Sequence, residues 1–191
     1  IYNECSFLYD FCRTIDNIAD QESELDFKIK QFKKFKENFI NKNFNNQTIK
    51  NMYKVIDDHQ ISKRIIYDLF DGVESDLKKE VVINSKKELL IYSYRVAGTV
   101  GLMMAKIFNI KKKNSLKAAI DLGIAMQLTN IARDVVEDSN KNRKYIDTNF
   151  ESIKKTLMIA DSFYKSSLPS ISDIPITCRF AILVARRVYR Q

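Results

Sequence analysis

Hydrophobic residues recur every three or four positions along most of this chain, which is the spacing of amphipathic helices. The clearest cases are residues 4–20 and 25–40, where Phe, Ile and Leu are interspersed with polar positions. The same spacing predicts helices at about residues 48–57, 59–71, 86–108, 115–138, 150–167 and 175–190. Breaks are expected in the Asn-rich stretch 41–47, near Gly72, at 111–114, at 140–142, and at Pro169 and Pro175. No convincing strand pattern interrupts these helices, so the sequence predicts one all-α domain over residues 1–191.

The composition narrows the class of protein. The 191 residues suffice for one domain with a sizeable core. Only 4 Gly and 2 Pro are present, which leaves little room for hairpins or glycine-rich phosphate-binding loops. Three cysteines without framework spacing favour a reducing, cytoplasmic setting, and no apolar run approaches the ~18 residues that a membrane span needs. The sequence begins at Ile1 inside a helical pattern, so we expect the natural start to lie further upstream.

The charge balance is basic, with 32 Lys and Arg against 24 Asp and Glu, a net charge of +8. Such a balance is compatible with nucleic acid, an anionic membrane surface or a phosphorylated substrate. No basic patch with interleaved aromatic residues is present, so we expect no nucleic-acid partner. The basic, amphipathic segment 28–36 leaves open a peripheral contact between a cytoplasmic protein and a membrane surface.

The first candidate for chemistry is a set of polar residues on one face of the helix predicted at 4–20. Tyr9, Arg13, Asp16 and Asp20 fall within an arc of about 60°, and Asp16 and Asp20 lie ~6 Å apart along the helix axis. Like charges at this spacing repel by a few tenths of a kcal/mol, so a compensating group is expected. Paired carboxylates suit Mg²⁺, which binds through one or two carboxylates together with substrate phosphates.

The second candidate lies in residues 121–138. Gln127, Asn130, Asp134 and Asp138 share a strip about 80° wide with Gly123, and the rest of the helix circumference is apolar. The strip contains no Lys, although the chain is rich in Lys. Polar groups aligned on an apolar helix are costly to bury unless they meet a ligand or a metal ion. The pattern therefore indicates a functional strip rather than a solvated face.

Two such acidic faces on opposite walls of a helical bundle would hold magnesium ions and a diphosphate between them. Arg13, Arg133 and Arg143 are available for the remaining diphosphate oxygens. An apolar cavity next to such a site would shelter a carbocation from water. The sequence thus favours the ionisation of an allylic diphosphate.

Four segments of the chain resemble the squalene/phytoene synthase family. Residues 9–20 (YDFCRTIDNIAD) are similar to its first aspartate-rich motif, and residues 123–138, followed by 142–145, are similar to its second. Residues 92–101 (YSYRVAGTVG) resemble its central helix, and residues 185–189 resemble its late tyrosine-bearing helix. The four segments follow the order that they have in the family, and their sequences are most similar to those of bacterial phytoene synthases.

The resemblance implies an isoprenoid-synthase helical bundle with a central cavity. The implied activity is the head-to-head condensation of two geranylgeranyl diphosphates to phytoene through a cyclopropyl diphosphate, with Mg²⁺ as the cofactor and Mn²⁺ as its substitute. The implied metal ligands are Asp16, Asp20, Asn130, Asp134 and Asp138. The implied catalytic residues are Asp16, Asp20, Asp134, Asp138 and Tyr189. The implied substrate-binding residues are Tyr9, Arg13, Val96, Gly98, Gln127, Asn130, Arg133, Arg143 and Tyr145.

Several alternatives stay open at this level. Farnesyl diphosphate, with a C30 product of the squalene or dehydrosqualene type, is the alternative substrate, and a non-catalytic assembly factor of the family is a second alternative. Gly98 has two interpretations, space for a prenyl chain or tight helix packing. Tyr92 could line the cavity or belong to the core. Asp76, which follows Gly72, is interpreted as part of a simple turn.

Overall fold

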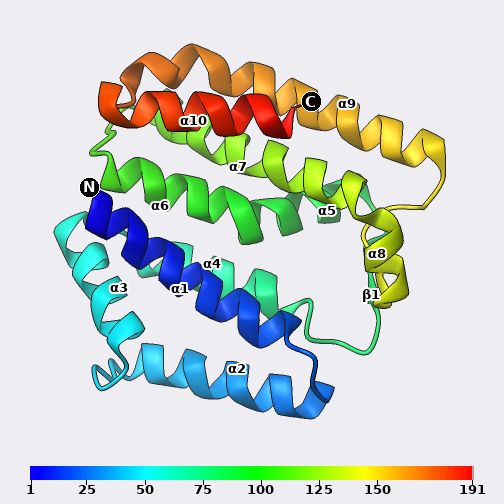
Figure 1. Cartoon of the computed structure of the whole chain (residues 1–191), viewed down its shortest axis with the longest axis horizontal. Coiled ribbons are helices and arrows are strands. Elements are labelled where there is room, and N and C mark those ends of the chain that lie inside the picture. Colours follow the sequence, from blue (N-terminus) through cyan, green and yellow to red (C-terminus); the bar gives the residue numbers. More distant parts are fainter. Residues whose placement is uncertain (191) are drawn as a thin grey trace.

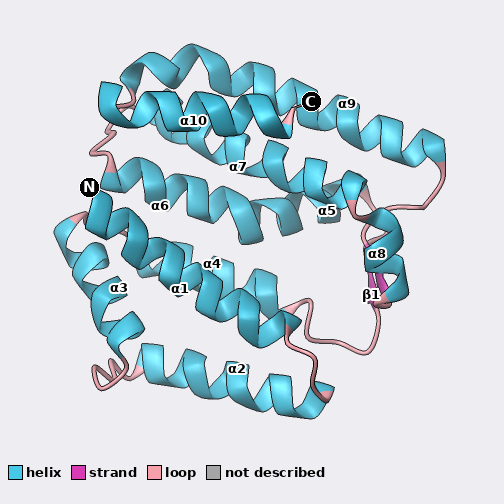
Figure 2. Cartoon of the chain, in the orientation of Figure 1, coloured by secondary structure: helices cyan, strands magenta, loops and turns pink. Residues whose placement is uncertain are grey.

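The computed structural model describes residues 1–190, which are mainly helical (Figures 1 and 2). The helices are α1 (Tyr2–Asp20), α2 (Leu25–Ile40), α3 (Gln47–Asp58), α4 (Lys63–Glu74), α5 (Lys86–Ser93), α6 (Thr99–Ile107), α7 (Lys113–Arg133), α8 (Val135–Asn140), α9 (Phe150–Ser167) and α10 (Ile176–Tyr189). A π-helical turn (Tyr94–Gly98) joins α5 to α6, and a 3₁₀ turn (Leu168–Asp173) joins α9 to α10. The predicted helical fold is confirmed.

The helices pack around two hydrophobic clusters. The first lies among α1, α2, α3, α4 and α6, and its centre is the aromatic group Phe11, Phe39 and Phe70, whose ring centroids lie 5.4–5.9 Å apart. The second lies among α5, α7 and α9 and contains Leu128 and Tyr164. Burial of each such side chain contributes about 1.5–3 kcal/mol, so the apolar stripes of these helices specify their packing. Figure 1 shows α6 between α1 and α7, which places these three helices around the site described below.

Capping residues decide where several helices begin. The side chains of Asn46, Ser62, Ser85 and Asn149 each accept a hydrogen bond from the first turn of the helix that follows. Because Ser62 caps α4, this helix spans Lys63–Glu74 rather than the predicted 59–71. The predicted break near Gly72 is present, since α4 ends at Glu74; Gly72 itself lies in the last turn of α4, where it allows a close approach to Arg95 and Val96.

Three local features depart from the predicted pattern. The helix predicted at 86–108 contains the π-helical turn, and the helix predicted at 115–138 is interrupted at Asp134, between α7 and α8. In addition, β1 (Val81–Val82) pairs in parallel with β2 (Arg143–Lys144), where no strand was predicted. A two-residue strand is too short to leave a period-two signal in a sequence. Figure 2 shows this small pair beside α8.

The contacts of α7 with α6 and with the π-helical turn depend on glycine. A methyl group at Gly123 would overlap the carbonyl oxygen of Ala97, and one at Gly101 would overlap that of Ala119. At Gly98 a methyl group would meet side chains rather than backbone, the ring of Tyr94 at 3.0 Å and Ile120 at 3.2 Å.

We therefore expect Gly123→Ala to lower the free energy of unfolding by about 1–3 kcal/mol, because overpacking outweighs the gain in helix propensity. Gly98→Ala should cost less. Urea denaturation of both variants checks this prediction, and equal stability of Gly123→Ala and the parent chain would contradict it.

Candidate functional site

Two adjoining cavities lie where α1, α6 and α7 meet. One is mainly apolar, with a volume of about 440 Å³, and the other is acidic, with a volume of about 250 Å³. Asp16, Val96 and Asn130 line both of them. Asp16 comes from α1, Val96 from the π-helical turn and Asn130 from α7, so three segments distant in sequence form the boundary between the cavities. A ligand with a charged head and an apolar tail would fit across this boundary.

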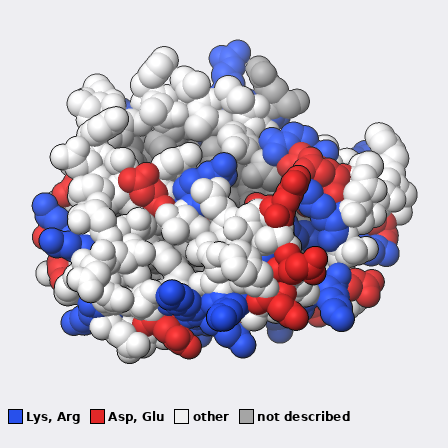
Figure 3. Space-filling view, turned by 60° about the horizontal axis from the view of Figure 1, so that its bottom comes forward, with Lys and Arg blue, Asp and Glu red and all other residues white. Residues whose placement is uncertain are grey.

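The acidic cavity brings the two predicted carboxylate faces together. Asp16 and Asp20 line it from α1, and Asn130, Asp134 and Asp138 line it from the end of α7 and from α8. Gln127, Arg143 and Tyr145 also contribute to its wall. In the surface view, acidic and basic side chains crowd together at one end of the face, while much of the remaining face is uncharged (Figure 3). The predicted opposition of the two faces across one pocket is therefore present.

The interruption between α7 and α8 changes the second face. Asp134 lies between the two helices with φ −97° and ψ 11°, so the strip of Asn130, Asp134 and Asp138 is not one straight helix edge. Arg133 holds both oxygens of Asp134, with Nε–Oδ1 at 2.7 Å and Nη2–Oδ2 at 2.6 Å. This pair lowers the pKa of Asp134. Arg133 thus neutralises one carboxylate of the second face.

Two other carboxylates of the site are poorly compensated. Desolvation of the carboxyl group, followed by the charge of Asp20, raises the pKa of Asp16 to about 6, although the residue as a whole is exposed. Burial also raises the pKa of Asp138 to about 6, where the charge of Asp134 adds to the effect and Arg143 opposes it. Carboxyl groups with such pKa values gain from a nearby cation. The pocket therefore favours a positively charged ligand.

The donors present fit Mg²⁺ bound jointly by protein and ligand. The Oδ1 atom of Asn130 is buried and has no hydrogen-bond partner among the described residues. Within residues 1–190, no three Asp, Glu, His or Cys side chains stand close enough to enclose a metal ion by themselves. Mg²⁺ commonly uses one or two carboxylates and completes its coordination with water and phosphate oxygens. Carboxylates on opposite walls together with a free amide oxygen match that arrangement.

The apolar cavity extends away from the acidic one along α7. On this helix the lining residues extend from Asn130 to Ser115, which are fifteen residues apart and thus separated by about 22 Å along the axis. Phe108 and Ile110 line its deep end, and Tyr189 of α10 lines the end near Asn130. The remaining walls are mainly small or apolar side chains, contributed by α1, α4, the π-helical turn, α6, α7, α9, the 3₁₀ turn and α10. The cavity is long enough along α7 to hold an extended hydrocarbon chain.

Some predicted site residues lie elsewhere. Tyr9 is 64% exposed and lines neither cavity, although Cys12, three residues further along α1, lines the apolar one. Arg13 is exposed and also lines neither cavity. Gly98 packs against Tyr94 and Ile120 and lines neither cavity, which favours the packing interpretation over space for a prenyl chain.

The sequence-based reasoning missed Asp76. It lies in the segment between α4 and β1, lines the acidic cavity and accepts hydrogen bonds from Tyr92 and Tyr145, each at 2.7 Å. Burial raises the pKa of Asp76, and the two tyrosine hydroxyls oppose this rise. Helical periodicity cannot reveal a residue outside the helices. The only signal in the sequence is the presence of an acidic residue just after Gly72.

Comparison with known proteins reveals clear relatives. A family model described as squalene/phytoene synthase matches residues 2–149. A phytoene synthase from Pseudescherichia vulneris is 32% identical over 154 residues, which cover 70% of this chain and 50% of the relative. A 15-cis-phytoene synthase from Pantoea ananas is 28% identical over 218 residues, covering 96% and 70%. A presqualene diphosphate synthase from Sinorhizobium fredii is 27% identical over 141 residues, covering 73% and 50%. The chain thus spans between half and 70% of the length of these relatives.

Two crystal structures share the fold. A dehydrosqualene synthase in complex with a ligand superposes with a TM-score of 0.79 at 24% identity, covering 98% of this chain and 73% of the other. A squalene synthase from Alicyclobacillus acidocaldarius superposes with a TM-score of 0.81 at 14% identity, covering 96% and 78%. These likenesses confirm the helical-bundle fold expected from the sequence.

Proposed function

The chain belongs to the squalene/phytoene synthase family, whose members are enzymes of the prenyltransferase type, and we propose that it joins two geranylgeranyl diphosphates head to head to form phytoene through a cyclopropyl diphosphate. The observation that carries this proposal is the boundary between the two cavities. Asp16 and Asn130 line an acidic cavity on one side and a long apolar cavity on the other. A prenyl diphosphate combines the same two properties in one molecule.

The residues of the acidic cavity would bind the diphosphate head. Mg²⁺, with Mn²⁺ as its substitute, would be held by the five predicted ligands Asp16, Asp20, Asn130, Asp134 and Asp138. When bound, the metal neutralises the diphosphate and favours its departure. Arg143 is in position to donate to diphosphate oxygens, since its Nη1 lies 3.1 Å from Oδ1 of Asp20 and its side chain lines the cavity. The amide of Gln127 offers a further donor on the same wall.

The apolar cavity would hold the prenyl tail and exclude water from the reacting carbons. Met104, Leu122 and Met126 lie along it, and Tyr189 lines its end near Asn130. Methionine side chains are polarisable, and the aromatic ring of a tyrosine attracts a cation that lies over its face. Tyr189 therefore contributes to the wall closest to the bond that breaks.

A C30 product from two farnesyl diphosphates is the second candidate. It is supported by the presqualene diphosphate synthase among the relatives and by the dehydrosqualene synthase among the shared folds. The C40 product is supported by relatives described as phytoene synthases and by the length of the apolar cavity, about 22 Å along α7.

Incubation of the full-length protein with Mg²⁺ and either geranylgeranyl or farnesyl diphosphate, followed by extraction of hydrocarbons, tests the proposal. A C40 hydrocarbon from geranylgeranyl diphosphate is the expected result. A product from farnesyl diphosphate alone would replace the proposal with the C30 alternative. The absence of product from both substrates would reject both enzymatic proposals and favour the assembly-factor alternative.

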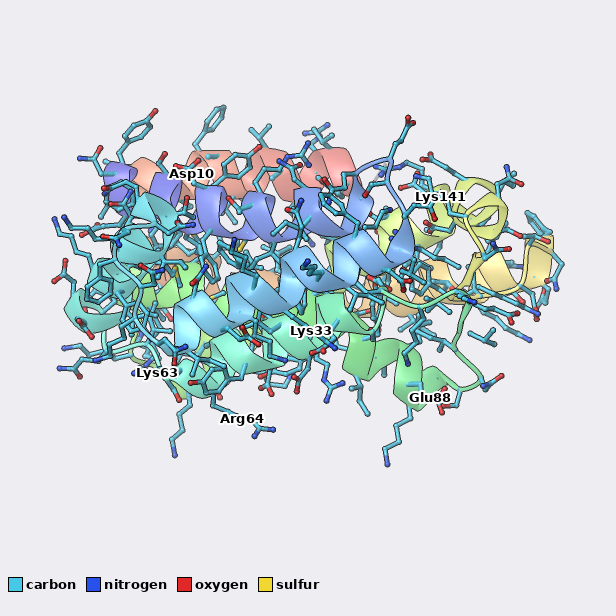
Figure 4. The ribbon with its side chains drawn as sticks, turned by 90° about the horizontal axis from the view of Figure 1, so that it is seen from below. Asp10, Lys33, Lys63, Arg64, Glu88 and Lys141 are labelled. Carbon is cyan, nitrogen blue, oxygen red and sulfur yellow. The ribbon has the colours of Figure 1, made fainter. Side chains whose placement is uncertain are left out.

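We also propose peripheral contact with an anionic membrane through α2, since the substrates are lipophilic. Lys33 lies on the face of α2 that is turned toward the viewer in Figure 4. Lys30 and Lys34 of the same helix are solvent-exposed. Within residues 1–190, no helix has the length and apolar character to cross a bilayer. Co-sedimentation with vesicles that does not increase with their anionic lipid content would reject this contact.

A further inference from the structure

Asp76 connects two stacked tyrosines at the edge of the acidic cavity. The hydroxyl of Tyr92 donates to its Oδ2, and the hydroxyl of Tyr145 donates to its Oδ1, both at 2.7 Å. The two hydroxyl oxygens lie 3.0 Å apart, and the two rings stack with centroids 4.8 Å apart. Tyr92 and Tyr145 are only 8% and 6% exposed. Asp76 is therefore the acceptor for both hydroxyls in a site that excludes most water.

The segment after α4, which carries Asp76, also holds residues 142–145, which include Arg143. The backbone N–H of Val81 donates to the carbonyl of Asn142 at 2.9 Å, and that of Ile83 donates to Lys144 at 3.0 Å. Tyr145 follows directly, so residues 142–145 are attached to the loop both by backbone hydrogen bonds and by the Asp76–Tyr145 bond. A change at Asp76 would therefore release one end of this short segment.

Arg143 lies within this attached segment and points into the site. Its guanidinium meets Asp20 across the cavity at 3.1 Å, and its side chain is 17% exposed. Because the guanidinium binds oxygen ligands only in a narrow range of geometries, a small shift of its backbone weakens the contact. The position of Arg143 therefore depends on how firmly residues 142–145 are held.

We propose that Asp76 is a positioning residue, which acts through Tyr145 to hold Arg143 where it meets the diphosphate of the substrate. This inference rests on the proposed function, since it assumes a diphosphate in the acidic cavity. A carboxylate suits the task because its two oxygens accept from both tyrosines, and its negative charge also attracts Arg143. An apolar or a singly accepting side chain would leave one buried hydroxyl without its partner.

The first test compares Asp76→Asn with Asp121→Asn. Asp121 is a matched control, because it is 4% exposed and accepts hydrogen bonds from Lys117 and Ser166, yet it lines neither cavity. Binding of inorganic pyrophosphate in the presence of Mg²⁺ is measured by calorimetry on the full-length protein. We expect Asp76→Asn to weaken this binding by at least about tenfold, as loss of a supporting hydrogen bond does at metal sites. Asp121→Asn should lower the melting temperature without changing this affinity.

The second test asks whether Asp76 acts on Arg143 through its hydrogen bond with Tyr145. Tyr145→Phe should weaken pyrophosphate binding as Asp76→Asn does, and the double variant should be no weaker than Asp76→Asn alone, because both changes remove the same link. Tyr53→Phe is the control, since the buried hydroxyl of Tyr53 donates to the carbonyl of Phe39 at 2.9 Å in another part of the molecule. Tyr53→Phe should leave the affinity unchanged.

Several results would overturn the inference. Wild-type affinity in a folded Asp76→Asn variant would contradict it and leave the proposed function intact. If Asp76→Asn does not fold, wild-type affinity in Tyr145→Phe would contradict it equally. Absence of pyrophosphate binding by the wild-type protein with Mg²⁺ would overturn both the inference and the proposed function.

Discussion

Replacement of Asp138 by Asn is expected to remove most of the activity and to make the free protein more stable. The activity should fall by about two to three orders of magnitude, which is the usual effect of removing one preorganised electrostatic group. The gain in stability follows from the raised pKa of about 6, because the ionised carboxylate is unfavourable in this pocket. Burial and charges, not hydrogen bonds from the described residues, set the pKa of the Asp138 side chain, so the amide loses no partner. Part of the stability of the fold is thus given up for function.

The pH dependence of this gain has a definite sign. An Asp whose folded pKa lies above its unfolded value, here about 6 against 3.8, binds its proton more tightly in the folded state. Its stabilising contribution is complete below about pH 4 and is lost as the pH rises through 6. We therefore expect Asp138→Asn to exceed the wild type in free energy of unfolding by on the order of 1–2 kcal/mol at pH 7.5, allowing for partial exposure, and to match it near pH 4.

Denaturant titrations at the two pH values, alongside product assays, check this prediction. Glu137→Gln is the matched control, because Glu137 is the preceding residue, is exposed and, among residues 1–190, forms its ion pair with Lys141 alone. Its replacement should change stability and activity little. A stability of Asp138→Asn below that of the wild type at pH 7.5, or retained activity, would contradict the assignment of Asp138 to the charged site.

Replacement of Ala118 by Phe is expected to change the preferred substrate length. Ala118 lines the apolar cavity twelve residues before Asn130, about 18 Å along α7 from the acidic end. A phenyl ring there would fill the deep part of the cavity, which only the longer prenyl chain needs. We expect kcat/KM for geranylgeranyl diphosphate to fall by about 10- to 100-fold, the range found when a pocket must reject a slightly larger group. The value for farnesyl diphosphate should fall much less.

The measurement is the ratio of C40 to C30 product when both substrates compete. Ala118→Leu should give an intermediate ratio, and Asn114→Phe provides the control, since Asn114 is exposed on the first turn of the same helix. A melting temperature for each variant separates loss of the cavity from loss of the fold. An unchanged product ratio in a folded Ala118→Phe protein would show that the prenyl tail does not extend to this end of the cavity.

Much of the candidate site was predictable because its chemistry is local in sequence. Asp16 and Asp20 share one helix face by spacing alone, and the polar strip on residues 121–138 stands out against its apolar helix. The structure places both at one cavity. Tyr9 shares the face of Asp16 by spacing, yet it is 64% exposed and lines neither cavity, because spacing along one helix does not show which edge of a face the neighbouring helices cover.

The amino-acid sequence by itself determined the helices, the carboxylates of the two faces and the family, since periodicity, side-chain chemistry and motif order can be read along one chain. Only the tertiary structure decided that Asp76 and Tyr92 belong to the acidic cavity and that Gly98 serves packing. It also decided that α7 ends at Arg133. These features depend on which distant segments pack together, and the free energy that selects the packing is shared among many contacts, so no short stretch of sequence contains it.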